Sequence, residues 1–225
     1  MTHTDSPPDR PRRRRRKDAR PGEIVAAAID VFVERGFGAA RLEEVARRAG
    51  VAKGTVFVYF PTKSDLFRAV AQALLTANFE PLENAAADAG LPLSDLIPLL
   101  LAQAALVGEG KVSAVIRLLI AESRAFPDLA QVWHDEVVAK VLGLLTAAIE
   151  RAQLRGEIRA GDARLQAFSI IGPMLAGVIF REVFRDTTAY LPDLRELASQ
   201  HAHIVLRGLK AEFSDPTAKA SPQVE

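Results

Sequence analysis

Apolar residues at helical spacing run through most of the chain, and this pattern constrains its fold more than any other feature. From Glu23 onward, side chains such as Ile24, Ala27, Ala28 and Val31 recur three and four residues apart, as they do on one face of a helix. No segment alternates with period two over the length of a strand, and β-branched residues do not gather between hairpin turns. The sequence therefore predicts an all-α fold.

Glycine and proline divide this pattern into separate helices. Proline favours the first turn of a helix and glycine its C-terminal end, so Pro21 and Gly36 bound the first helix, and Pro61 stops a later one. Thr62 is placed to cap the helix that follows. We expect helices over residues 21–36, 42–49, 53–60, 64–78, 79–89, 94–108, 111–125, 128–155, 162–186 and 192–211.

Charge and composition divide the chain into unequal parts. Residues 1–68 hold 15 Lys and Arg against 9 Asp and Glu, whereas the remainder holds 14 against 19. Such a basic end suits contact with phosphates, although a solvated basic tail would have the same composition. We expect a disordered basic arm over residues 1–20, a small domain over 21–68, a larger helical domain over 69–212, and a disordered tail over 213–225.

Several functional classes find no support in the sequence. The absence of cysteine excludes disulfides and thiolate metal sites. We identify no nucleophile elbow, phosphate-binding glycine loop or paired metal-ligand motif, so no enzyme, catalytic residue, cofactor or metal is predicted. His201 and His203 are two residues apart and would face different sides of a helix. No uncharged apolar run approaches the length of a membrane span, so we expect a cytoplasmic protein.

The segment 42–59, LEEVARRAGVAKGTVFVY, has the residues that two short crossed helices require. Ala46 is small enough for close helix crossing, and Gly50 can adopt the positive φ of a sharp turn. The side chains expected to fill the wedge between the two helices are Val45, Ala49, Val51 and Val56. The combination at this spacing predicts a helix-turn-helix, although each residue alone would be weak evidence.

Residues 22–70 resemble the N-terminal domain of the TetR family of transcriptional regulators almost without gaps. The resemblance is carried by ERGF at 34–37, AGVAKGT at 49–55, YF at 59–60 and the lysine at position 63. The segment from Ile120 to Trp133, IAESRAFPDLAQVW, resembles a subgroup with AefR-like C-terminal domains. The resemblance implies an N-terminal three-helix DNA-binding domain and a C-terminal domain that dimerises and binds a ligand.

By this resemblance the third helix is the recognition helix, which enters the major groove. Thr55, Phe57 and Val58 would face the bases, while Val56 and Phe60 would face inward. Tyr59, Lys63 and Lys53 match positions suited to phosphates, and Arg41 is a further candidate in a place where the usual hydroxyl cap is missing. Core packing and solvated surface charge are the alternatives. The predicted DNA-binding residues are Arg41, Lys53, Gly54, Thr55, Phe57, Val58, Tyr59 and Lys63.

The C-terminal helices are expected to form a homodimer, because one helix-turn-helix contacts too few base pairs for specificity. Helices 162–186 and 192–211 carry apolar stripes that could pair between subunits or pack internally: Phe168, Ile171, Leu175, Val178, Leu194, Leu197, His201, Ile204 and Val205. The residues expected to line a ligand cavity, with core packing as the alternative, are Phe79, Leu100, Ile116, Ile120, Arg124, Phe126, Trp133, Phe168 and Met174. Glu122, Arg124 and His134 are the polar groups expected to orient the ligand.

The resulting hypothesis is a ligand-responsive regulator, a repressor that binds a palindromic DNA operator as a homodimer and is released by a small, largely apolar effector. The alternative is a non-specific architectural DNA-binding protein that uses the arginine run from Arg12 to Arg16. An acidic helical body of this size is unnecessary for binding by charge alone. A helical enzyme is a third possibility that no motif favours.

Overall fold

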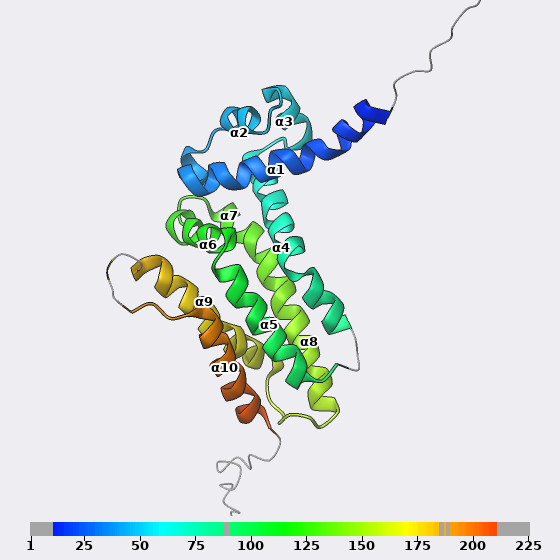
Figure 1. The fold of residues 1–225 in the computed structure, drawn as a ribbon, viewed down its shortest axis with the longest axis vertical. Coiled ribbons are helices and arrows are strands. Elements are labelled where there is room, and N and C mark those ends of the chain that lie inside the picture. The colour runs from blue at the N-terminus through cyan, green and yellow to red at the C-terminus, as the bar shows by residue number, and fades with distance from the viewer. Residues whose placement is uncertain (1–10, 88–90, 185–186, 188–189, 211–225) are drawn as a thin grey trace, which may run out of the picture.

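The computed structural model shows a helical protein with a small domain at one end and a longer bundle below it (Figure 1). Within the described residues there is no strand, and an isolated antiparallel bridge joins Ile158 to Lys210. The all-α prediction is confirmed. The described residues are 11–87, 91–184, 187 and 190–210.

Helices α1 to α3 form the small domain, and α4 descends from it into the bundle (Figure 1). The bundle consists of α5 to α10, with α10 packed extensively along α5 and α8 along α9. The elements are α1 (Pro11–Ala39), α2 (Leu42–Arg48), α3 (Lys53–Tyr59), α4 (Lys63–Ala87), α5 (Leu93–Gly108), α6 (Lys111–Glu122), α7 (Pro127–Trp133), the π-helical turn η1 (His134–Val138), α8 (Ala139–Leu154), α9 (Ala163–Phe184) and α10 (Leu194–Leu209).

The first helix begins earlier than the sequence pattern suggested. Residues 11–20 were expected to be disordered, but α1 starts at Pro11 and continues through Pro21. Arginine, lysine and alanine are strong helix formers, and Pro11 stands in the first turn, where proline is tolerated, so apolar burial is not needed to start this helix. Pro21 lies inside the helix, where it can donate no backbone hydrogen bond. Gly36, with φ of 77°, ends the regular part of α1 as predicted. Residues 1–10 and 211–225 lie outside the described residues.

Two other expected boundaries differ from the structure. The helices predicted over 64–78 and 79–89 form one helix, α4, which is continuous from Lys63 to Ala87. The helix predicted over 128–155 is continuous in its course but contains the wider turn η1. The predicted cap of α4 is confirmed: the Asp65 amide donates to Thr62 Oγ1 at 3.0 Å, and the Thr62 amide donates to the Asp65 carboxylate at 3.0 Å.

The buried apolar side chains form two cores. The first unites α1 to α4 with residues of α6, α7 and η1, and at its centre the rings of Phe32, Phe37 and Phe67 lie 5.5 to 6.0 Å apart. The second lies between α5, α8, α9 and α10. Because the first core contains Leu118 and Leu129, it extends well beyond the domain boundary predicted near residue 68. The DNA-binding domain and part of the body therefore share buried apolar surface.

Helix α9 is long and apolar enough to cross a membrane by length and composition alone, although its uncharged run covers only residues 165–180. Its charged residues lie near its two ends, at Arg164, Arg181 and Glu182. In the structure α9 packs against α5, α6, α8 and α10. This position is that of a helix shared between the core of the bundle and its surface.

Gly36 is a position where the fold depends on glycine. Its φ of 77° and ψ of 166° are a combination that side chains rarely adopt, and an added Cβ would lie 2.2 Å from Glu122 Oε1. Gly36→Ala should lower the free energy of unfolding by about 1–3 kcal/mol in urea titrations. Gly143→Ala is the matched control, because Gly143 is helical with open space around it, and this change should add roughly 0.5–1 kcal/mol. Equal stability of the two variants would contradict the constraint.

Candidate functional site

The turn between α2 and α3 has the hydrogen bonds that close a helix with glycine. The Val51 amide donates to the Ala46 carbonyl at 3.0 Å, and the Gly50 amide donates to the Arg47 carbonyl at 3.2 Å. Gly50 has a φ of 66°, the positive value predicted for it. Val45, Ala46 and Val56 are buried and Ala49 and Val51 half-buried, so these residues fill the wedge between the helices.

Helix α3 has one buried face and one exposed face, as predicted. Val56 is fully buried and Phe60 is 9% exposed, whereas Phe57 is 41% and Val58 78% exposed. Thr55 is half-buried. Two large apolar side chains therefore face outward on a seven-residue helix, and the alternative that they pack in the core is wrong.

The basic and glycine positions around α3 are exposed. Lys53 Nζ lies 2.5 Å from the Glu43 carboxylate and 5.8 Å from the centre of the Phe57 ring. The hydrogen bond from Lys53 holds the pKa of Glu43 below its ordinary value. Lys53 would therefore have to leave Glu43 in order to contact a phosphate. Gly54 has no atom within 4 Å of the position of an added Cβ, so its backbone is open to close approach.

Arg41 and Tyr59 flank this surface. Arg41 is exposed and occupies the N-cap of α2 without a side-chain cap bond, as the missing hydroxyl predicted. Tyr59 is half-buried, with its ring 6.5 Å from that of Phe60. The described structure brings Arg41, Lys53 and Tyr59 to the same small domain as the exposed face of α3. Their contacts with phosphate stay predictions.

Lys63 has a structural use that the sequence did not reveal. Its ammonium donates to the backbone carbonyls of Phe37 at 2.5 Å, of Gly38 at 3.1 Å and of Ala40 at 3.1 Å, and lies 4.7 Å from the centre of the Phe37 ring. Burial lowers the pKa of Lys63, while the nearby charge of Glu122 opposes this shift. Because these three bonds match the three protons of the ammonium, a phosphate contact would require one of them to be given up.

Glu122 holds the same turn from the opposite side. Its carboxylate accepts from the Phe37 amide at 3.0 Å and from the Gly38 amide at 2.6 Å, across 84 and 85 positions in the sequence. Beside it, the rings of Phe126 and Phe37 lie 5.3 Å apart. We had expected Glu122 to orient a ligand, and Phe126 to line a ligand cavity. The structure instead uses both to attach the body to the DNA-binding domain.

Arg48 fixes α2 to α1, a role that no pattern in the sequence indicated. Its guanidinium donates to both carboxylate oxygens of Glu34 at 2.7 and 2.6 Å, and to Glu44 at 2.8 Å. These bonds hold the pKa of Glu34 below its ordinary value. A bidentate pair sets the orientation of both side chains and so adds to the apolar contacts in positioning α2.

The predicted ligand-binding residues line neither of the two cavities found in the described part of the chain. Leu100 and Met174 are buried in the second core, whereas Ile120 and Phe168 are 60% and 63% exposed. The remaining members are Phe79 and Ile116, which pack against both cores, Trp133 and Phe126, which pack against the first, and the exposed Arg124. Periodicity had identified apolar faces without showing which would be filled by neighbouring helices.

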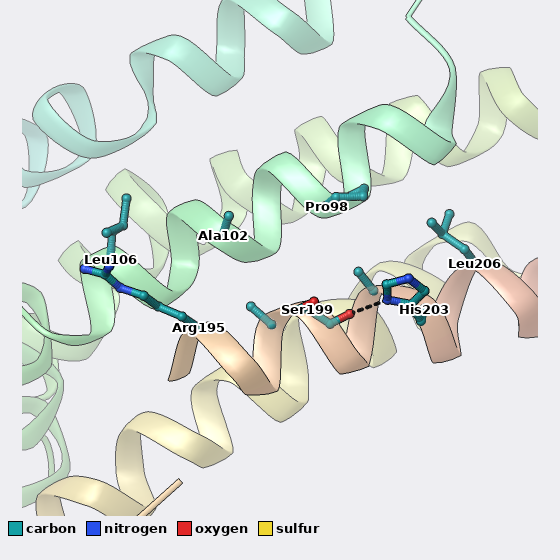
Figure 2. Close-up of a pocket in the computed structure, with 9 residues that line it drawn as sticks. Pro98, Ala102, Leu106, Arg195, Ser199, His203 and Leu206 are labelled. Carbon is teal, nitrogen blue, oxygen red and sulfur yellow. Dashed lines mark hydrogen bonds between the residues drawn. The ribbon is translucent and has the colours of Figure 1, made fainter. Parts of the chain in front are cut away.

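A groove lies elsewhere, between α5 and α10 (Figure 2). It has a volume of about 450 Å³. Its floor and walls are mostly apolar, with Arg195, Ser199 and His203 as polar members. The other lining residues are Pro98, Ala102, Leu106, Ala198, Ala202 and Leu206. None of these nine residues was predicted to bind a ligand.

The helices expected to dimerise expose part of their predicted stripes. On α9 the predicted residues Phe168 and Leu175 are 63% and 42% exposed, and on α10 Ile204 is 68% exposed. Leu165 on α9, which was not among the predicted residues, is also exposed, at 67%. The rest of the predicted set is buried or half-buried: Val178, Leu194, Ile171, Leu197, His201 and Val205. The stripes thus serve the second core and also leave an apolar surface on α9 and α10.

The chain matches two family models. Residues 24–70 match the model described as bacterial regulatory proteins, tetR family, and residues 86–198, half of the chain, match the tetracyclin repressor-like C-terminal domain. The second description does not name the AefR-like subgroup, which stays a prediction. Both models fall on the segments assigned above to the two functional parts.

The similar proteins are also regulators. The HTH-type transcriptional regulator RutR of Escherichia coli is 29% identical over 159 residues, which is 67% of each chain. The transcriptional activator FasR of Mycolicibacterium smegmatis is 45% identical over 56 residues, 25% of this chain and 26% of that protein. The crystal structure of the regulator FadR from Bacillus subtilis in complex with stearoyl-CoA covers 84% of this chain and 98% of that chain, with a TM-score of 0.70 and 22% identity. The chain belongs to the TetR family of transcriptional regulators.

Proposed function

We propose that this protein is a repressor that binds a palindromic DNA operator as a homodimer and releases it when a small, largely apolar effector binds the C-terminal domain. The observation that carries the DNA-binding part is the outward placement of Phe57 and Val58 on α3. Such side chains contact thymine methyl groups in a major groove, and neighbouring lysines contact phosphates. A regulator of this family acts on the chromosome, so we place it in the cytoplasm.

The homodimer is supported by the apolar surface on α9 and α10. Large apolar side chains exposed together on adjacent helices mark an interaction surface. A twofold arrangement would pair this surface with itself and present two copies of α3 to two half-sites of a palindrome. The non-specific alternative requires no such pairing.

Release by an effector is supported by the contacts between the body and the DNA-binding domain. Glu122 at the end of α6 holds the turn after α1, and Lys111 on α6 pairs with Asp30 on α1 at 2.7 Å. A ligand that displaced α6 or α4 would therefore move the small domain. The FadR structure, with the same fold, is described as a complex with stearoyl-CoA, which supports an apolar effector here. FasR is named an activator, so a reporter assay must test the direction of regulation.

The DNA-binding assignment predicts how variants of α3 behave toward a duplex selected by the protein from a random library. Phe57→Ala and Val58→Ala should each weaken binding to that duplex by roughly 1–3 kcal/mol and leave the affinity for random DNA unchanged. Lys53→Gln should instead reduce the slope of log affinity against log salt by about 1. Leu154→Ala, at an exposed site on α8, is the control in fluorescence anisotropy titrations. Selection that returns no preferred sequence would favour the non-specific alternative.

The homodimer predicts a change in mass when charge is placed on the apolar surface. Phe168→Glu and Ile204→Glu should convert the dimer to a monomer in sedimentation velocity, because each would bury an unpaired carboxylate at the interface. Leu154→Glu is the control, since Leu154 is 88% exposed but lies at the end of α8. A dimer that persists in both test variants would place the interface elsewhere.

The attachment at Glu122 predicts a specific loss of stability. Glu122→Gln retains one acceptor oxygen but turns an amide N–H₂ toward the second backbone amide, so unfolding should become easier by about 1–3 kcal/mol. Hydrogen exchange at the Phe37 and Gly38 amides should speed up in the folded protein. The control is Glu150→Gln, an exposed carboxylate on α8. Unchanged exchange at both amides would show that Glu122 does not hold the turn in solution.

A further inference from the structure

The groove between α5 and α10 is long, narrow and apolar along most of its length. On the α5 side it is lined by Pro98, Ala102 and Leu106, which are spaced four residues apart on one face of the helix. On the α10 side it runs from Arg195 to Leu206, which is about 16 Å of helix at 1.5 Å per residue (Figure 2). The alanines that line both sides keep the groove open to a slender apolar chain.

A second cavity of about 550 Å³ adjoins one end of this groove. The two share His203 and Leu206, so they follow one another along α10. His203 Nδ1 lies 2.8 Å from the Ser199 carbonyl, to which it donates (Figure 2). The second cavity is lined further by Pro92, Leu93, Ser94, Glu157, Ile158, Arg207 and Lys210. The apolar groove therefore opens into a chamber beside the start of α5 that carries charged side chains on a partly apolar wall.

The chamber carries an excess of positive charge. Arg207 and Lys210 pair with no carboxylate within the described part of the chain. Glu157 is already neutralised, because it pairs with Arg155 at 2.5 Å and accepts from the Leu93 amide at 3.3 Å. The start of α5 adds the positive end of a helix dipole, although its Leu93 amide already donates to Glu157. An anion entering the chamber would meet two cations and no competing free carboxylate among these lining residues.

We propose that the groove and chamber form a binding site for an anionic amphiphile with one unbranched apolar chain. Its carboxylate lies beside Arg207 and Lys210, and its chain lies along Ala102, Ala198 and Ala202 toward Leu106. A second copy of the protein is a poorer occupant, because the exposed apolar residues proposed for the dimer, such as Phe168 and Ile204, do not line the groove. The inference rests on the proposed function only where it names this amphiphile as the effector.

The test is calorimetric titration of the full-length protein with sodium dodecanoate below its micelle concentration. Dodecanoate should bind at one site per chain. Octanoate lacks four CH₂ groups and should bind at least about tenfold more weakly, and up to about two hundredfold if all four are fully buried. Ala102→Phe, which fills the groove from its exposed rim, should weaken dodecanoate at least about tenfold. Leu99→Phe, at an exposed α5 residue that does not line the groove, is the control and should bind as the parent protein does. Equal binding by Ala102→Phe would overturn the site.

The charge of the chamber is tested separately. The double variant Arg207→Gln with Lys210→Gln should weaken dodecanoate about fivefold or more and leave neutral 1-dodecanol unchanged. Both residues are exposed, so circular dichroism should show the parent fold. If the parent protein bound 1-dodecanol as tightly as dodecanoate, or more tightly, the anionic assignment would be overturned.

A gel shift with the duplex obtained by selection separates this inference from the proposed function. Dodecanoate should weaken the binding of the parent protein to that duplex and should not affect the binding of the Ala102→Phe variant. Binding in the groove without an effect on the duplex would overturn the effector assignment while the DNA-binding function stands. A protein that selects no duplex but still binds dodecanoate in the groove would overturn the proposed function while the site stands.

Discussion

The turn that ends α1 is held between opposite charges, and the placement of the DNA-binding domain on the body depends on it. Lys63 binds its carbonyls from α4, and Glu122 binds its amides from α6. Peptide groups carry both partial charges, so one short turn can satisfy an ammonium on one side and a carboxylate on the other. Gly36 makes this possible, because a side chain there would occupy the place of the Glu122 carboxylate.

The shared apolar core gives the same attachment its rigidity. Phe37 packs against Phe67 on α4 and against Phe126 beside α7, so its ring belongs to both parts of the molecule. Within η1, Glu136 receives hydrogen bonds from Arg68 at 3.0 Å and Gln72 at 3.1 Å, both on α4. A packed core moves between discrete arrangements more readily than it deforms, so these contacts would convert a shift of α4 or α6 into a rotation of the small domain.

The sequence was informative wherever local spacing decides the outcome. The alternation of buried Val56 with exposed Phe57 and Val58 follows from helical period and the wedge against α2, and both were predicted from residues fewer than twenty positions apart. Glu122 was misassigned because its partners lie 84 and 85 positions away, which no pattern within a segment reveals. The ligand-lining set failed for a related reason: an apolar residue such as Leu100 fits a cavity wall and a filled core equally well until its neighbours are known.

The wide turn η1 separates two stretches of what is otherwise one long helix, α7 to α8. Before it, Leu129 and Val132 are buried in the first core, and after it, Leu145 and Ile149 are buried in the second. A π-type turn takes in about one residue more than an α turn and so changes the phase of the helix by roughly 100°. The extra residue rotates the buried face of α8 relative to that of α7. One continuous helix can therefore contribute buried side chains to two cores that lie in different directions. Deleting one residue from η1 would leave the apolar residues of both cores in place in the sequence, but the buried faces of α7 and α8 would no longer point toward their two cores at the same time.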